Sequence, residues 1–160
     1  MDRKVDNINN KDFSLLMAAV LEKGKAFRFQ ASGASMSPII KNGDILTVAD
    51  VKNKCIRIGD VVAFTHPKNG NLTIHRVVKK STDKFLMKSD NGLQVDGWIR
   101  RDAIIGIIQS VERGERLKNL GLGWEKVYIA FFSRWNVLGK MISVLWRILP
   151  NCVKQRIKRI

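Results

Sequence analysis

The first regular pattern of apolar residues predicts a short helix near the N-terminus. Asn10 or Asp12 can cap this helix, and Gly24 can end it. Four apolar residues recur at the spacing of one helix face: Leu15, Leu16, Ala19 and Val20. We expect this helix to act as a lid or brace for the rest of the fold.

From residue 26 the period changes to two, which is typical of strands with one covered face. Phe27 and Phe29 alternate with polar residues, and apolar runs predict further strands at 44–49, 60–65, 73–79, 84–88 and 103–111. A hairpin turn is predicted at Asn69 and Gly70, because this pair readily adopts positive φ. Since no strand–helix–strand alternation follows, we expect a mainly β fold with an antiparallel core.

The last part of the chain returns to a helical pattern. Between residues 127 and 149 the polar positions, with the exception of Arg134, form one stripe on an otherwise apolar segment: Ser133, Asn136, Lys140, Ser143 and Arg147. The segment is long enough to span a bilayer, but burying Lys140 costs about 2.5 to 3.5 kcal/mol, which makes spanning marginal. A helix that lies in the membrane interface satisfies these polar groups. The alternative is a helix packed on the protein's own sheet or on a partner.

The charge is strongly positive and concentrated at the C-terminal end. The chain has 29 Lys and Arg against 14 Asp and Glu, a net charge of +15. Residues 113–160 hold 11 Lys and Arg against 2 Glu, a local charge of +9. Such a tail suits an anionic surface, and charge alone does not choose between nucleic acid and acidic lipid.

Composition excludes several classes of protein. With 45% hydrophobic residues, 3 Pro and 12 Gly, the chain is neither disordered nor collagen-like. Cys55 and Cys152 form neither a disulfide framework nor a CxxC site, and two His nine residues apart do not form a zinc pattern. We therefore expect no metal and no cofactor. The N-terminus lacks the apolar run of a signal peptide or anchor, so we expect the chain to begin in the cytosol.

The stretch most indicative of chemistry is SGASMSP at residues 32–38, which is followed by Gly43 and Asp44. Ser35 lies in a tight loop just after a strand, between Gly33 and Pro38. Such a loop can hold a serine outward with its own N–H free to donate to an oxyanion. Small residues with Pro between strands also form ordinary turns, so this stretch alone does not identify a nucleophile.

A histidine lies inside a β-branched strand, at His75 in the sequence IHRVV. Thr73, His75 and Val77 share one face of this strand. A neutral imidazole there can take a proton from a hydroxyl, and imidazole changes charge between about pH 5 and 8. The alternative is a strand histidine whose ring is bonded to a backbone carbonyl.

Two carboxylates, Asp90 and Asp96, follow the next strand in a predicted loop. One of them could orient the imidazole and stabilise the imidazolium that forms during catalysis. Each could instead form an Asx turn.

Together these stretches resemble the signal peptidase superfamily of serine peptidases (S24/S26), and most closely its histidine-bearing archaeal and endoplasmic-reticulum branch. The resemblance covers roughly residues 26–112 in consistent order. Its motifs are Ser35-Met36-x-Pro38, Gly43-Asp44, Gly59-Asp60, Ile74-His75-Arg76-Val77-Val78, Lys88-x-Asp90-Asn91, Asp96 and Ile105-Gly106-x-Ile108. The chain is also similar to small signal-peptidase-like proteins found near bacterial peptide-modification and export clusters.

The resemblance implies the coiled antiparallel β fold shared with self-cleaving repressors, together with a role for four residues. Ser35 matches the nucleophile, and His75 matches the position of the general base. Asp96 matches the triad carboxylate, and Asp90 matches a neighbouring acidic residue that supports the site.

The resemblance also implies the oxyanion and substrate contacts, which we expect at Gly33, Ala34 and Met36. Met36 is expected to pack beneath the nucleophile loop or to line the small-residue pocket for the substrate side chain. Gly33 departs from the family pattern, which often has a serine whose hydroxyl helps the oxyanion. That donor must be replaced by a backbone N–H or be missing, and losing one donor can cost about 10² to 10³ in rate. The usual N-terminal membrane anchor is also absent from the sequence.

We expect three parts: a helical segment at 1–25, a catalytic β domain at 26–116 and a basic amphipathic extension at 117–160. The expected function is that of a serine endopeptidase resembling signal peptidase I, which cleaves a leader- or signal-type peptide. We expect it to associate peripherally with an anionic membrane surface through the C-terminal helix, on the cytoplasmic side, and not to bind nucleic acid. The alternative is a noncatalytic module of the same fold that binds an anionic membrane or nucleic acid. Self-cleavage is disfavoured because residues 1–25 offer little linker to present in cis.

Overall fold

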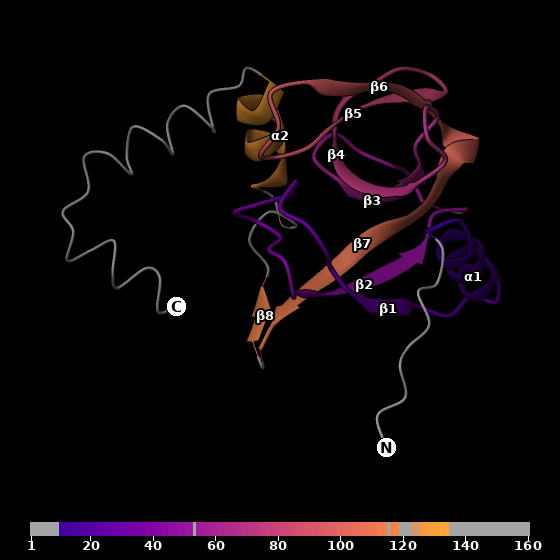
Figure 1. The fold of residues 1–160 in the computed structure, drawn as a ribbon. Helices are drawn as coiled ribbons and strands as arrows, with labels where there is room; N and C mark the ends of the chain where they lie inside the picture. Colours follow the sequence, from indigo (N-terminus) through magenta and orange to yellow (C-terminus); the bar gives the residue numbers. More distant parts are fainter. Residues whose placement is uncertain (1–9, 53, 115, 119–122, 124, 135–160) are drawn as a thin grey trace, which may run out of the picture.

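The structure is a computed structural model that describes residues 10–134 apart from 53, 115, 119–122 and 124 (Figure 1). Its helices are α1 (Asn10–Glu22), the short 3-10 helix η1 (Arg101–Ala103) and α2 (Lys126–Arg134). Its strands are β1 (Phe27–Gln30), β2 (Ile45–Asp50), β3 (Val61–Thr65), β4 (Leu72–Lys80), β5 (Lys84–Lys88), β6 (Val95–Arg100), β7 (Ile104–Arg113) and β8 (Arg116–Lys118). The expectation of a mainly β fold with a short N-terminal helix and a C-terminal helix is confirmed.

All the strands belong to one coiled antiparallel sheet. The strand order is β1-β2-β7-β3-β4-β5-β6, and β8 pairs with β7 beside this path. β1 and β6 are the ends of the path, so the sheet does not close into a barrel. In Figure 1 the part formed by β3 to β6 is strongly curled, and the part formed by β1 and β2 lies below it.

β7 joins the two parts of the sheet. It pairs with β2 from Gly106 to Glu112 and with β3 from Ile104 to Ile107. A Cβ atom on Gly106 would lie 2.4 Å from Val48 Cγ1 and 2.9 Å from a methyl group of Leu21. Only glycine therefore allows β2, β7 and α1 to approach one another this closely at that position.

The buried side chains form two clusters, and β3 contributes to both. Val61 and Ala63 lie in the cluster beneath α1, whereas Val62 and Phe64 lie in the cluster inside the curled part. Because successive side chains of a strand point to opposite faces, β3 is covered on both sides. This central position fixes β4, the next strand in the sheet and the one that carries His75.

The predicted N-terminal helix is confirmed as α1, but the predicted buried face is wrong. Leu15 and Leu16 are 66% and 48% exposed, whereas Met17 and Leu21 are fully buried against the sheet. The helix carries apolar residues on more than one side. Its contacts with β7 and β2 bury the side that contains Met17. Helical periodicity alone does not make that choice.

The predicted strands are present with their ends shifted by at most two residues, and two further strands were not predicted. One of these, β6, begins at Val95, so Asp96 lies in a strand and not in a loop. Gly97 has φ +108, and the register between β5 and β6 shifts between Met87 and Lys88. This irregular stretch lacks the strict alternation that identifies a strand in sequence.

The C-terminal prediction is only partly within the described residues. α2 forms the beginning of the predicted segment, and the remainder of the polar stripe and the basic tail, 135–160, lie outside the described residues. α2 packs against the turn before β3: Lys126 Nζ lies 2.5 Å from Asp60 Oδ1, and a Cβ on Gly59 would lie 2.7 Å from the Lys126 carbonyl. In the part of the chain that the structure describes, neither α-helix is both long and apolar enough to cross a membrane.

Candidate active site

The loop between β1 and β2 carries Ser35. Its two ends are joined because the Ala31 N–H donates to the Asp44 carbonyl at 2.7 Å and the Gly43 N–H donates to the Ala31 carbonyl at 2.9 Å. Gly33 has φ +98, a conformation that favours glycine, and its N–H donates to Asn42 Oδ1 at 3.1 Å. The backbone therefore accounts for a glycine here, and the Gly33 N–H already has an acceptor.

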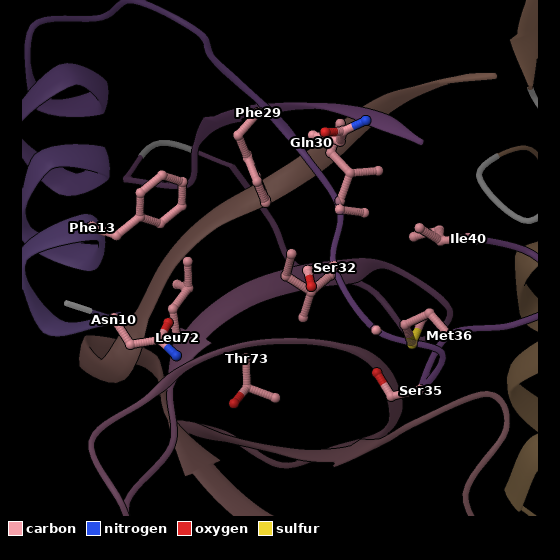
Figure 2. Close-up of a pocket in the computed structure, with 14 residues that line it drawn as sticks. Asn10, Phe13, Phe29, Gln30, Ser32, Ser35, Met36, Ile40, Leu72 and Thr73 are labelled. Atoms are coloured by element: carbon pink, nitrogen blue, oxygen red, sulfur yellow. The ribbon is translucent and has the colours of Figure 1, made fainter. Parts of the chain in front are cut away.

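Ser35 is exposed at the edge of a cavity of about 430 Å³. Figure 2 shows Ser35, Met36 and Thr73 around this cavity, together with Phe13 from α1 and Phe29 from β1. The apolar residues that line it are Phe13, Phe29, Ala31, Met36, Ile40, Leu46, Leu72 and Ile74. Its volume lies within the range of ligand pockets.

α1 forms one wall of this cavity. The Phe13 ring meets the rings of Phe27 and Phe29 edge-on, at centroid distances of 5.5 and 5.4 Å. Asn10, in the first turn of the helix, also lines the cavity. The helix therefore braces the sheet and also forms part of the cavity wall beside Ser35.

His75 and Asp96 form a direct pair. His75 Nδ1 lies 2.6 Å from Asp96 Oδ2, and their side chains are only 11% and 17% exposed. The residues come from β4 and β6, which are separated in the sheet by β5. A carboxylate that accepts from Nδ1 leaves Nε2 as the nitrogen that can exchange a proton with a substrate or a hydroxyl.

Asp90 has a different partner. Its two oxygens accept from Arg76 Nε at 2.8 Å and from a terminal nitrogen of Arg76 at 2.7 Å. Arg76 also donates to the Gly59 carbonyl at 2.7 Å and is fully buried. Of the two predicted carboxylates, Asp96 therefore meets the imidazole, and Asp90 is held by the arginine that follows His75.

The loop after β5 links these residues to Ser35. The Asn91 N–H donates to the Ser35 carbonyl at 2.9 Å, and the Asn91 side-chain amide donates to the Ala34 carbonyl at 3.3 Å. Asn91 directly follows Asp90, which Arg76 holds. The loop that carries Ser35 is thus connected to β4, the strand of His75, through the two hydrogen bonds from Asn91 and the ion pair between Asp90 and Arg76.

Lys88 supports this loop from inside the protein. Its side chain is nearly fully buried, and Nζ donates to the carbonyls of Ser89 and Gly92. Burial lowers the pKa of Lys88, and the nearby charges of Asp90 and Asp96 oppose that shift. In addition, the Gly92 N–H donates to the Ser89 hydroxyl at 2.9 Å.

The structure does not join Ser35 directly to His75. In the described part of the chain, the Ser35 hydroxyl has no hydrogen bond to the ring, and its N–H has no described acceptor. Thr73 and Ile74, the two residues before His75, line the same cavity as Ser35. The catalytic roles of Ser35, His75, Asp96 and Asp90 therefore stay predictions. Asn42, Asn91 and Arg76 were not assigned a role from the sequence, because each acts through a side-chain contact that residue type and spacing do not reveal.

Asp44 and Asp60 fix turns. Asp44 accepts from the Lys41 N–H and Asp60 from the Arg57 N–H, both at 2.7 Å. Asp44 also pairs with Arg113 at 2.7 Å. Burial acts to raise the pKa of Asp44, but the bonds to Arg113 and Lys41 outweigh it and hold that pKa below the ordinary value.

Within the described residues, no group of three His, Cys, Asp or Glu side chains gathers in a way that could hold a metal ion.

Comparison with known proteins gives a family. The profile described as Peptidase S24-like matches residues 2–109, more than half of the chain. No curated protein matches the sequence. The match includes Ser35, His75 and Asp96 and the first seven strands up to most of β7. The chain therefore belongs to the Peptidase S24-like family, a family with a serine peptidase fold.

Proposed function

We propose that this protein is a serine endopeptidase resembling signal peptidase I, which cuts a leader- or signal-type peptide. The proposal is supported above all by the 2.6 Å contact between His75 Nδ1 and Asp96 Oδ2. A carboxylate held against Nδ1 is the arrangement that prepares an imidazole to act as a general base. The family match supports a serine peptidase, and the restriction to leader-type peptides rests on the resemblance of the motifs.

In the proposed reaction Ser35 Oγ attacks the peptide carbonyl while its proton passes to His75 Nε2. The Ser35 N–H stabilises the negative oxygen of the tetrahedral intermediate. The intermediate collapses to an acyl-serine ester, and His75 gives the proton to the leaving amine. Water, activated by the same ring, then hydrolyses the ester. Bonds between nucleophile and base often form only when substrate is bound, so we expect the bond between Ser35 and His75 to form in the substrate complex.

An extended peptide would occupy the cavity next to Ser35. Such a peptide can pair with an exposed strand edge through its main chain and place alternate side chains in pockets. β1 is an edge strand, and Phe29 and Gln30 on it line the cavity. The apolar lining favours apolar side chains near the cut.

The test uses a fluorophosphonate, which labels an activated serine without knowledge of the substrate. We expect labelling at Ser35, mapped by mass spectrometry, and its loss in both Ser35→Ala and His75→Ala. Cleavage of a leader-bearing precursor should be lost in the same two variants. If the unmodified chain is neither labelled nor able to cut the precursor, the protein is a noncatalytic member of the fold. If both variants still cut the precursor, the assignment of Ser35 and His75 is wrong.

We also propose that the protein associates peripherally with an anionic membrane surface on the cytoplasmic side. The net charge of +15 supports electrostatic attraction to acidic lipid. Val127, Tyr128 and Phe131 on α2 are 51%, 59% and 58% exposed and lie on one side of that helix. Apolar residues beside basic ones are typical of helices that lie in the membrane interface.

Flotation with liposomes tests this association. The chain should float with vesicles that contain phosphatidylserine and not with vesicles of phosphatidylcholine alone. The double variant Val127→Glu with Phe131→Glu should float less, whereas Leu15→Glu with Leu16→Glu, on the exposed side of α1, is the matched control. If both double variants float equally well, α2 is not the contact.

A further inference from the structure

We propose that Asn91 is a positioning residue that aims the Ser35 N–H at the oxyanion. This inference rests on the proposed peptidase function and adds a residue to it. Asn91 donates twice to the nucleophile loop, with its backbone N–H to the Ser35 carbonyl and with its side-chain amide to the Ala34 carbonyl. Its own place is therefore fixed relative to both peptide units that flank Ser35.

The geometry of the peptide bond explains why this matters. In a trans peptide the carbonyl oxygen of one residue and the N–H of the next point in opposite directions. The Ala34 carbonyl and the Ser35 N–H belong to the same peptide unit, so a donor that holds the Ala34 carbonyl sets the direction of the Ser35 N–H. The Ser37 N–H also donates to the Ala34 carbonyl, at 3.1 Å, so Asn91 shares this task with a turn.

The donors expected from position 33 are already used or missing. The Gly33 N–H donates to Asn42, and glycine has no hydroxyl with which to replace the serine found at that position in related enzymes. The Ser35 N–H, by contrast, has no acceptor among the described residues. The Ser35 N–H therefore remains available at the nucleophile itself, and the reaction rate depends on the direction in which this N–H points.

The loop that carries Asn91 is itself rigidly held. Asp90, the preceding residue, forms two bonds with the buried Arg76. Gly92, the following residue, donates its N–H to the Ser89 hydroxyl. A Cβ on Gly92 would lie 2.1 Å from that hydroxyl, so the loop has no room for a side chain at this position. Residues on both sides of Asn91 are thus fixed, which is what a positioning residue requires.

The decisive variant is Asn91→Asp. Aspartate has nearly the same shape, but a carboxylate only accepts hydrogen bonds and cannot donate to the Ala34 carbonyl. The backbone bond from residue 91 to Ser35 remains. The matched control is Asn69→Asp in the exposed hairpin between β3 and β4, where Asn69 Oδ1 accepts from the Asn71 N–H and a carboxylate can do the same.

Saturation kinetics of fluorophosphonate labelling separate reaction from binding. For Asn91→Asp we expect the maximal labelling rate, kinact, to fall about tenfold, less than the loss of a whole oxyanion donor. The inhibitor constant KI should stay within about twofold, because only the reacting centre is affected. The shape of the pH profile should not change, because the pair of His75 and Asp96 is untouched. Asn69→Asp should match the unmodified chain in all three respects, and Asn91→Ala should also lower kinact.

The outcomes separate the two proposals. If the unmodified chain is labelled and Asn91→Asp labels at the same rate, the positioning role is refuted and the peptidase function stands. If Asn91→Asp raises KI as much as it lowers kinact, or lowers the melting temperature by several degrees, Asn91 is merely structural and the inference is refuted. If the unmodified chain is not labelled, the proposed function fails and this inference fails with it.

Discussion

Replacing Asp96 by Asn removes a negative charge from the ring of His75 and keeps the shape of the side chain. Asp96 Oδ2 lies 2.6 Å from His75 Nδ1, and both side chains are more than four-fifths buried. An asparagine there can still accept a bond through its amide oxygen, but it no longer stabilises an imidazolium. The proposed reaction forms an imidazolium each time Ser35 attacks, so the variant should slow that step.

The magnitude follows from the distance. Two unit charges whose centres are about 4 Å apart interact by about 4 kcal/mol at an effective dielectric constant of about 20. Each 1.36 kcal/mol corresponds to a factor of ten in rate, so we expect Asp96→Asn to be about 10³-fold slower.

The assay is the rate of fluorophosphonate labelling at Ser35, measured from pH 5 to 8. The control is Asp102→Asn, since Asp102 is paired with Arg100 at the surface and its side chain is 66% exposed. The control should react like the unmodified chain. Should Asp96→Asn be labelled at the unmodified rate across this pH range, the ring of His75 does not depend on Asp96 and the triad is refuted.

Three further predictions concern stability and are checked by urea unfolding. Asp90→Asn leaves the buried guanidinium of Arg76 without its carboxylate and should lower the free energy of unfolding by about 3 to 5 kcal/mol; an unchanged unfolding midpoint contradicts this. Gly106→Ala forces a Cβ into contact with β2 and should cost about 1 to 3 kcal/mol, unless β7 moves away freely. The lowered pKa of Asp44 means that its bond with Arg113 stabilises the fold above the ordinary Asp pKa of 3.8 and that this stability is lost as the pH falls through the lowered value. Asp44→Asn should therefore be less stable near neutral pH and lose less stability between pH 5 and 2 than the unmodified chain; equal acid sensitivity would exclude Asp44 as a cause.

Much of the fold could be predicted from the local pattern of apolar, polar and turn residues. The strands β2, β3, β4, β5 and β7 are rich in β-branched and apolar residues, and turn residues bound them. The turn at Asn69 and Gly70 formed as predicted, with Gly70 at φ +69 and the His66 N–H bonded to the Asn71 carbonyl at 2.9 Å. By contrast, β6 was not predicted, because Gly97 and the irregular pairing with β5 interrupt the alternation of apolar and polar residues that identifies a strand.

Less of the candidate site than of the fold could be predicted from the sequence. The residue types at 35, 75 and 96 pointed to a serine peptidase, and the motifs indicated their order. The resemblance matched Asp96 to the triad carboxylate, but the residues alone could not decide which carboxylate meets the ring, because Asp90 and Asp96 follow the same strand and both fit the spacing. Asp96 is the partner of the ring because the buried Arg76 of β4 already binds both carboxylate oxygens of Asp90.

By itself, the sequence determined the antiparallel β class, the helix at the N-terminus and the residues capable of serine peptidase chemistry, since these depend on side-chain type and on periodicity over a few neighbours. Tertiary structure alone decided the buried face of α1, the partnership of His75 with Asp96, and the two bonds by which Asn91 holds the nucleophile loop. The bond between His75 and Asp96 joins residues 21 positions apart, and the bond between Asn91 and Ala34 joins residues 57 positions apart. Contacts over such separations are set by how the sheet coils and where its register shifts, and no local pattern of polar and apolar residues encodes either.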